Sequence, residues 1–265
     1  MKSSPINWLL IIFSSISIGS LLAISEKLIS LKIDSILPDS SELRKFRRPG
    51  TITLLSTNGE VIQKIGPATR EKITSEDMPI LIKKAFIAAE DRRFYKHKGV
   101  DFWGITRAIR NNLNQRSISE GGSTITQQLA RIVFLNQDRT ITRKLKEVAL
   151  AFKIERQLDK EKIFEQYLNK VYLGSNAYGI ADAAWIYFSK TPDLLKLEEV
   201  ALIAGLPPAP SKYSPLVNPG LALQRRSIVL KRMLRQGFIS EAEFSKSMVT
   251  KINLDPSTPK YFNSA

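Results

Sequence analysis

Cysteine is absent from the sequence, and histidine occurs only once, as His97. The absence of cysteine excludes disulfide bridges, thiol nucleophiles and zinc sites built on thiolates. It is compatible with an oxidising compartment, although many cytosolic proteins also lack cysteine. A single histidine excludes a metal site made of several histidines, and a Ser-His-Asp triad would have to use His97 itself.

Negative charge is scarce relative to positive charge. The 265 residues include 40 lysines and arginines against 25 aspartates and glutamates, a formal net charge of +15. This excess indicates an anionic partner, such as nucleic acid, an anionic membrane or a phosphate-bearing substrate. Hydrophobic residues make up 43% and charged residues 25% of the chain, a composition that is typical of globular proteins and excludes wholesale disorder.

The one long uncharged apolar run lies near the N-terminus, at Trp8–Ile24. Its 17 residues are at the short end of what spans a bilayer as a helix. Serines and glycine dilute the run, so a signal peptide or a buried helix are alternatives. A helical pattern continues through Leu28 and Leu31, which favours an uncleaved anchor. Cations are fewer before the run than after it, and by the positive-inside rule alone the rest of the chain would face the cytoplasm.

The rest of the chain has a short strand-forming part and a long helical part. Thr51–Leu55 and Val61–Ile65 flank Asn58-Gly59, a dipeptide suited to a tight turn, which predicts a β-hairpin. From Asp77 to Met248 the pattern is helical, and no strand is required. Glycine- and proline-containing breaks are expected at residue 99, at 121–122, around 136–139, at 174 and at 207–210.

We therefore predict a mainly α protein in four parts. These are a membrane anchor over residues 1–30, a stalk with the hairpin over 31–70, a helical domain over 71–248 and a tail over 249–265.

Glu90 directly follows an apolar helical run, in the segment Ala85–His97. Desolvation there would raise the pKa of Glu90 toward that of a working base, while the charges of Arg92 and Arg93 would lower it. The alternative is a solvated helix end whose acids pair with nearby arginines, with His97 as a structural hydrogen-bonding group.

A second segment, residues 121–131, combines two glycines with hydroxyl residues ahead of a helix. Thr124 and Gln127 have the spacing of a capping box. Ile125, Leu129, Ile132 and Val133 form the expected core stripe. Gln127, Gln128 and Arg131 remain on other faces, where they can contact a ligand, and the helix N-terminus can bind an anion. A Gly-Lys-Ser/Thr ending is missing, which excludes a nucleotide-binding P-loop. A simple helix cap is the alternative.

A third segment, residues 139–147, is rich in cations. Ile141, Leu145, Val148, Ala149 and Phe152 are expected to form the buried stripe of its helix. Arg143 and Glu147 are four residues apart. They predict either a surface ion pair worth a few tenths of a kcal/mol or a second carboxylate among cations that hold a pyrophosphate.

Together these segments resemble the glycosyltransferase module of class A penicillin-binding proteins and the monofunctional peptidoglycan glycosyltransferases (family 51). Five motifs occur in the family's order over about residues 50–240. They are Glu90–Phe94 with His97–Gly99, Gly121–Leu129 (GGSTITQQL), Arg143–Glu147, Tyr167–Gly174 with Tyr178–Ile180, and Glu198–Pro207. One departure is visible: Arg131-Ile132 stands where the family usually has Lys-Asn. Arginine keeps the charge but replaces a point cation with a planar fork.

The resemblance implies roles for individual residues. Glu90 would be the catalytic base and Glu147 the second essential carboxylate. The substrate-binding residues would be Asp91, Phe94, His97, Ser123, Thr124, Gln127, Gln128, Arg131, Arg139, Arg143 and Lys144. It also implies a lysozyme-like, two-lobed helical fold whose smaller lobe dips into the membrane. A divalent cation (Mg²⁺ or Mn²⁺), bound with the substrate pyrophosphate, is expected near Glu147.

The reaction that the resemblance implies is the polymerisation of lipid II into glycan strands for cell-wall biogenesis and cell shape. Glu90 would take the proton of the acceptor's 4-hydroxyl as it attacks the donor's anomeric carbon. The configuration inverts, and undecaprenyl pyrophosphate leaves. We expect a single-pass protein of the cytoplasmic membrane with its catalytic domain on the periplasmic or extracytoplasmic side, against the loop-charge count. Expected partners are lipid II, the growing glycan strand, the membrane and other cell-wall synthesis proteins.

The hairpin and the ending near Tyr261 look like those of bifunctional penicillin-binding proteins. The tail over 249–265 is therefore expected to be the remnant of a linker to an absent transpeptidase domain. No Ser-x-x-Lys nucleophile motif follows it, so penicillin-sensitive crosslinking is not expected.

Three other functions compete with this prediction. A lysozyme-like lytic enzyme also uses carboxylates in a cleft, but it has no pyrophosphate to neutralise. Four cations within eight residues, at 139, 143, 144 and 146, therefore favour the transferase. A catalytically silent membrane scaffold is a second alternative. Nucleic-acid binding would explain the charge but none of the motifs.

Overall fold

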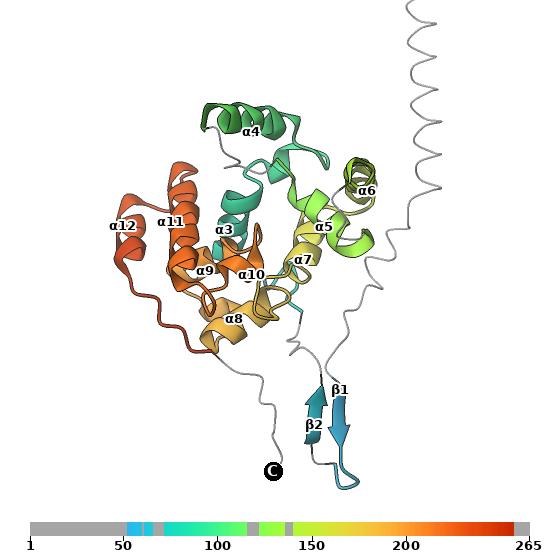
Figure 1. Cartoon of the computed structure of the whole chain (residues 1–265), viewed down its shortest axis with the longest axis vertical. Helices are drawn as coiled ribbons and strands as arrows, with labels where there is room; N and C mark the ends of the chain where they lie inside the picture. The colour runs from blue at the N-terminus through green and yellow to red at the C-terminus, as the bar shows by residue number, and fades with distance from the viewer. Residues whose placement is uncertain (1–51, 60, 66–71, 116–121, 136–139, 257–265) are drawn as a thin grey trace, which may run out of the picture.

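The computed structural model describes residues 52–59, 61–65, 72–115, 122–135 and 140–256 (Figure 1). The apolar run Trp8–Ile24, the expected substrate-binding residue Arg139 and the chain end near Tyr261 lie outside these ranges. The described part is mainly helical, as the sequence predicts, and it has one small sheet. None of its helices has both the length and the apolar character that a membrane-spanning segment requires.

The helical part begins at Ile80 and ends at Val249. Its α-helices and short 3-10 helices (η) are α3 (Ile80–Glu90), η1 (Phe94–Lys96), α4 (Phe102–Gln115), α5 (Ile125–Phe134), α6 (Ile141–Gln157), α7 (Lys160–Leu168), α8 (Ile180–Phe188), η2 (Pro192–Leu194), α9 (Leu197–Ala204), α10 (Pro210–Tyr213), α11 (Pro219–Arg235) and α12 (Glu241–Val249).

The sheet consists of two antiparallel strands, β1 (Ile52–Leu55) and β2 (Val61–Ile65). Ile52 lies opposite Ile65, and the register shifts between Leu54 and Leu55. Gly59 in the turn has a φ of 84°, a conformation that glycine adopts without steric cost.

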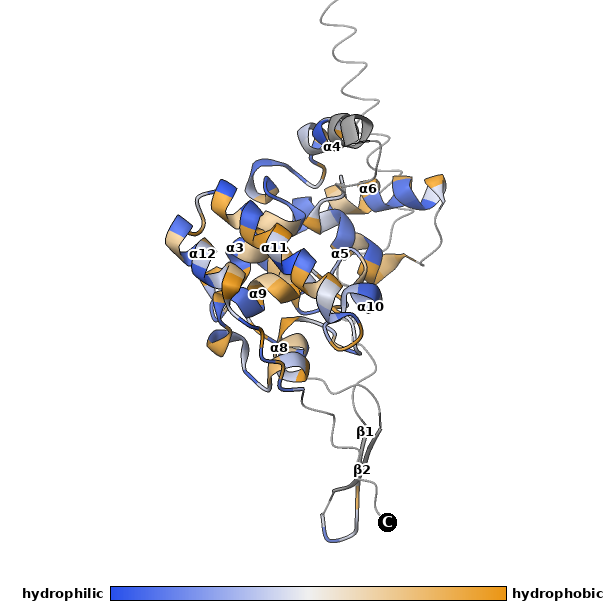
Figure 2. Ribbon diagram, turned by 60° about the vertical axis from the view of Figure 1, so that its left-hand side comes forward, coloured by the Kyte–Doolittle hydropathy of each residue, from blue (hydrophilic) through white to orange (hydrophobic). Residues whose placement is uncertain are grey.

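The core lies where α3, α9 and α11 pack on one another, with α5 packed against α6 and α7 on the other side of α3. Helices α3, α5, α6, α9 and α11 carry both apolar and polar residues (Figure 2), and packing of their apolar residues supplies most of the stability. Fully buried side chains in this core include Ile82, Phe86, Leu129, Tyr167, Ile203 and Met233.

Two glycines lie in connecting segments where neighbouring backbone comes close. Gly99 has a φ of 98° and Gly174 a φ of 85°. A Cβ atom on Gly174 would lie 2.5 Å from the carbonyl oxygen of Pro210, and one on Gly99 would lie 3.0 Å from that of Ala151. The predicted breaks at these two positions are therefore also close packing contacts, which a side chain would disrupt.

The prediction of which face of α6 is buried is wrong. Ile141 is 83% exposed, Leu145 65% and Phe152 37%, whereas the buried face carries Glu147, Leu150, Ala151 and Ile154. Both sets recur with the period of a helix, so hydrophobic periodicity alone could not choose between the two faces. The packing of α6 against α5 makes that choice.

The expected tail begins with residues that pack on the domain. Ile252 and Leu254 are partly buried against the core. The backbone N–H of Asp255 donates to the carbonyl of Tyr187 at 3.0 Å, and Ser189 Oγ donates to the carbonyl of Asp255 at 2.8 Å. Residues 252–255 are thus held on the domain, with Asp255 bonded at the C-terminal end of α8.

Candidate active site

An open cavity of about 550 Å³ lies at the C-terminal end of α3, bounded by α5, α11 and the loop after α9. Glu90 is the only acidic residue in its wall, among the described residues. Six arginines share that wall: Arg92, Arg107, Arg131, Arg225, Arg232 and Arg235. The cavity is therefore strongly cationic around a single carboxylate.

Glu90 is half-buried, and its two carboxylate oxygens differ. Oε2 accepts a hydrogen bond from Gln128 Nε2 at 2.8 Å, whereas Oε1 is buried without a hydrogen-bond partner in the described structure. Burial raises the pKa of Glu90 above its ordinary value, although the Gln128 amide and the charges of Arg225, Arg232 and Arg131 lower it. A carboxylate with a raised pKa and an unpartnered oxygen is suited to accept a proton.

The raised pKa of Glu90 agrees with the sequence prediction. The cations that lower this pKa, however, are not the predicted Arg92 and Arg93. Arg93 lies 3.3 Å from Asp101, measured from Nε to Oδ1. The opposing charges come instead from α5 and α11.

Glu147 lies on the buried face of α6, with a fully buried side chain. Arg143 Nη1 donates to its Oε2 at 3.1 Å, and Lys144 donates to its Oε1. Lys144 Nζ also donates to Ser123 Oγ at 2.9 Å, and Ser123 lines the cavity. Glu147 itself is not in the cavity wall, but Lys144 and Ser123 connect it to that wall.

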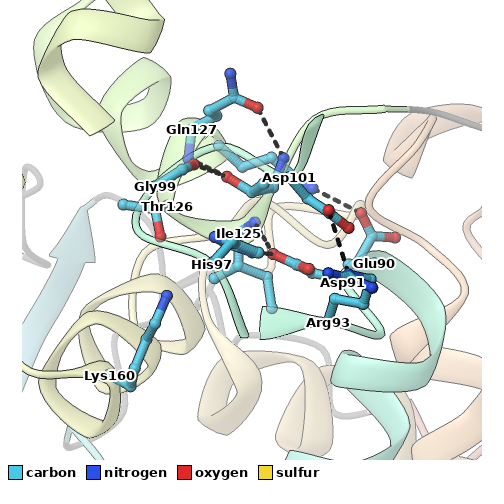
Figure 3. Close-up of polar contacts among 12 residues, drawn as sticks. Glu90, Asp91, Arg93, His97, Gly99, Asp101, Ile125, Thr126, Gln127 and Lys160 are labelled. Atoms are coloured by element: carbon cyan, nitrogen blue, oxygen red, sulfur yellow. Dashed lines mark hydrogen bonds and ion pairs between the residues drawn. The ribbon is translucent and has the colours of Figure 1, made fainter. Parts of the chain in front are cut away.

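Asp91, immediately after α3, is buried and joins two segments (Figure 3). Its Oδ2 accepts the backbone N–H of Ile125 at 3.0 Å and lies 2.9 Å from Nε2 of buried His97. The first N–H groups of a helix have no partner within the helix. The Asp91 carboxylate supplies one for α5 and so fixes its start beside the end of α3.

The predicted capping box is present at the start of α5. Thr124 Oγ1 accepts the N–H of Gln127 at 3.1 Å, and Gln127 Oε1 accepts the N–H of Thr124 at 2.9 Å. Thr124 Oγ1 also donates to the carbonyl of Gly99 at 2.6 Å.

Phe94 is fully buried, with its ring centroid 5.8 Å from that of Phe164.

The residues that the sequence nominates thus fall into three groups. Glu90, Ser123, Gln128 and Arg131 line the cavity; Arg143, Lys144 and Glu147 form the network connected to it; Asp91, Phe94, His97, Thr124 and Gln127 are buried behind its wall.

Sequence reasoning missed the arginines of α11. Arg225, Arg232 and Arg235 are spaced by seven and three residues, which places them on one helix face. That spacing could have revealed a cationic face, but not that it faces Glu90. The adjacent Arg226 is buried and donates to the carbonyls of Thr250 and Met248 at 2.9 Å each.

A family profile described as "Transglycosylase" matches residues 58–234, about two thirds of the chain. The chain belongs to the transglycosylase family. Penicillin-binding protein 1A of Escherichia coli (strain K12) is 46% identical over 88% of this chain and 27% of its own length. The Aquifex aeolicus protein of the same name is 45% identical over 80% of this chain and 29% of its own. A crystal structure of penicillin-binding protein 1A from Haemophilus influenzae aligns with a TM-score of 0.47 and 23% identity, covering 80% of this chain and 22% of that one.

This transglycosylase chain spans just over a quarter of the length of the curated relatives that it matches. The matched residues include Glu90, Glu147 and every other described member of the three groups.

We expect Asp91→Ala to lower the free energy of unfolding by about 2–4 kcal/mol, because it leaves the buried Ile125 N–H and the His97 ring without their partner. Urea unfolding followed by circular dichroism measures this loss. Asp193→Ala, at an exposed position in η2, is the control and should be close to neutral. An Asp91→Ala protein as stable as wild type would show that the carboxylate does not hold α5 in place.

Proposed function

We propose that this protein polymerises lipid II into glycan strands, releasing undecaprenyl pyrophosphate with inversion at the anomeric carbon. The observation that carries the proposal is Glu90, the one carboxylate among the described residues of a cavity wall that also carries six arginines. A base for the acceptor hydroxyl and cations for anionic substrate groups are what this transfer needs.

In this mechanism Glu90 Oε1, the unpartnered oxygen, takes the proton of the acceptor's 4-hydroxyl as that oxygen attacks the donor's anomeric carbon. The raised pKa of Glu90 makes proton transfer more favourable than it would be for an exposed glutamate. Gln128 donates to Oε2, which leaves Oε1 without a competing hydrogen-bond donor.

The leaving pyrophosphate needs neutralisation of charge more than it needs a proton. Arg143, Lys144 and Arg131 are proposed to supply it, together with Arg139. A glycosidase instead protonates its leaving group with a carboxylic acid. Both oxygens of Glu147 already accept from cations, an arrangement that suits a carboxylate organising cations and favours transfer over lysis.

The α11 arginines are proposed to bind anionic groups of the acceptor. Arg225 and Arg232 line the cavity with Glu90, and α11 lies away from α6, with α3 and α5 between them in Figure 1. The cations of α11 and those of α6 thus lie on different sides of Glu90. This arrangement fits a donor and an acceptor that both carry phosphates.

Asp91, Phe94, His97, Thr124 and Gln127 are proposed to act by positioning. They are buried, and their hydrogen bonds and ring contacts join segments of this chain. The family's motifs would then hold the base and the helix next to it, besides contacting substrate.

The proposal includes a divalent cation that is bound mainly by the substrate. Among the described residues, no group of three or more acidic or histidine side chains could cage a metal ion. Mg²⁺ commonly needs only one or two protein carboxylates when substrate phosphates complete its shell. Glu147 is the candidate carboxylate, after exchanging a hydrogen bond from Lys144 or Arg143. When bound, the ion would neutralise charge on the pyrophosphate.

We also propose the membrane arrangement expected from the sequence. Residues 1–30 would anchor the chain in the cytoplasmic membrane, 31–70 would form the stalk, and 71–248 the extracytoplasmic catalytic domain with a lysozyme-like, two-lobed form. Exposed Phe102, Trp103, Ile141 and Leu145 lie on α4 and α6, which occupy the same end of the domain in both views (Figures 1 and 2). They support a membrane-dipping lobe there, with other cell-wall synthesis proteins as further partners.

Glu90→Gln should lower the rate of lipid II polymerisation by about 10²–10⁴-fold, because the base is lost. Gel analysis of labelled lipid II measures polymer. A raised pKa means that ionised Glu90 weakens the fold as the pH rises through that pKa, so glutamine should not reduce stability at neutral pH. Glu76→Gln, at an exposed site, is the control. Near-normal turnover by Glu90→Gln would refute the assignment, and shortened glycan from preformed polymer would favour the lytic alternative.

In the same assay, excess EDTA should slow polymerisation by about tenfold or more, and added Mg²⁺ or Mn²⁺ should restore it, because the ion stabilises developing charge. EDTA presaturated with Mg²⁺ is the control and should leave the rate unchanged. A rate that is insensitive to EDTA would remove the cation from the proposal.

An alkaline phosphatase fusion after Ala265 should be active, and the protein should stay in membranes through a high-salt wash. Salt weakens electrostatic attachment of a +15 chain to anionic lipid, but not a spanning helix. Ile16→Arg, which puts a charge in the middle of the apolar run, is the control and should release the protein. An inactive fusion would contradict the extracytoplasmic placement.

A further inference from the structure

Tyr167 on α7 is fully buried, and the mechanism above does not use it. Its hydroxyl donates to Gln128 Oε1 at 3.2 Å. Its ring packs edge-on against Phe86 of α3, with ring centroids 6.4 Å apart. Packing on α3 and the bond to α5 hold the hydroxyl at a fixed place behind the cavity.

Gln128 stands between Tyr167 and Glu90. An amide has a carbonyl oxygen that accepts and an NH₂ group that donates. With Oε1 turned to the tyrosine hydroxyl, Nε2 is turned to Glu90 and donates to Oε2 at 2.8 Å. A flipped amide would set its oxygen against the carboxylate oxygen, where it could accept only from a protonated Glu90.

We propose that Tyr167 is a positioning residue for the base: its hydroxyl fixes the orientation of the Gln128 amide, so that the NH₂ group supports ionised Glu90. The two hydrogen bonds connect α7, α5 and α3 in one chain. The inference rests on the proposed function only for the meaning of Glu90 as a base; the effect on Glu90 itself does not depend on it.

The tyrosine hydroxyl keeps its proton under working conditions. Burial raises the pKa of Tyr167 well above its ordinary value, and the nearby charge of Glu90 raises it further. The hydroxyl therefore remains a donor whenever Glu90 is ionised.

Other charged groups around Glu90 are left in place when the hydroxyl is removed. The charged groups that act on Glu90 are Arg131 on α5 and Arg225 and Arg232 on α11. Asp91 is the next residue in the chain, and Arg92 and Arg107 lie in the same cavity wall as Glu90. A change in the titration of Glu90 after loss of one neutral hydroxyl therefore reports the amide rather than the electrostatic surroundings.

The test is Tyr167→Phe in the full chain, with Glu90 titrated by carbon-13 carboxyl NMR and assigned by the signal lost in Glu90→Gln. We expect the midpoint of Glu90 to move to higher pH by about 0.5–1 pH unit, the size of one net hydrogen bond. Gln128→Met should move the midpoint in the same direction, and adding Tyr167→Phe to it should change nothing further.

The matched control is Tyr187→Phe. Tyr187 is also fully buried, but its hydroxyl donates to the carbonyl of Leu173 at 2.8 Å, so the Glu90 midpoint should stay unchanged. An unchanged midpoint in Tyr167→Phe, or a shift that persists in the Gln128→Met background, overturns the proposal. If Tyr167→Phe fails to fold, 3-fluorotyrosine at position 167 replaces it. This stronger donor should lower the midpoint, and an unmoved midpoint overturns the proposal there too.

The polymerisation assay then separates the two hypotheses. Tyr167→Phe should lose about three- to tenfold in rate below the Glu90 midpoint and little above it, because the acid limb moves with the base. If wild-type protein makes no polymer at any pH, the proposed function fails, and the NMR titration still decides the role of Tyr167.

Discussion

The bond from the Ile125 N–H to the Asp91 carboxylate is the contact on which the site depends. It joins the end of α3 to the start of α5 at 3.0 Å, and both ends carry a functional side chain. Glu90 precedes Asp91, and Gln128 follows Ile125 by one helical turn. One buried carboxylate therefore sets the distance between Glu90 and its amide partner Gln128. His97, 2.9 Å from the same oxygen, further restrains that carboxylate.

Burial and the surrounding positive charge shift the pKa of Glu90 in opposite directions, and burial has the larger effect. Three arginines and an amide lower the pKa of Glu90, yet it remains raised. Glu90 accepts a hydrogen bond from the Gln128 amide at Oε2, and its Oε1 is buried without a hydrogen-bond partner in the described structure. Glu147 is the opposite case, because two cations contact its two oxygens. The two glutamates thus differ in their hydrogen-bond partners: Glu147 accepts from two cations, and Glu90 accepts from one neutral amide.

Local signals in the sequence predicted local structure well. The Thr124–Gln127 capping box and the Arg143–Glu147 pair each depend on residues within a few positions of one another. Which face of α6 is buried, and which residues the α11 arginines face, depend on how the helices pack together. A helix with two apolar faces gives the same periodicity whichever face is buried, and spacing along α11 does not reveal that Glu90 lies opposite. The burial of Asp91 and Gln127 likewise follows from the joint between α3 and α5, which connects residues 34 positions apart.

The way residues 248–255 are attached has a mechanical consequence. Arg226 holds the carbonyls of Met248 and Thr250, and Asp255 is bonded to Tyr187 and Ser189 at the end of α8. A pull on the chain at residue 256 is therefore borne first by the bonds of Asp255 at α8, and by the guanidinium bonds of α11 only after those have yielded. Force from that direction reaches α3, which carries Glu90, by two routes: from α11 directly, and from α8 by way of α9. Tension at residue 256 is thus shared between two groups of bonds before it can displace the helix that ends at Glu90.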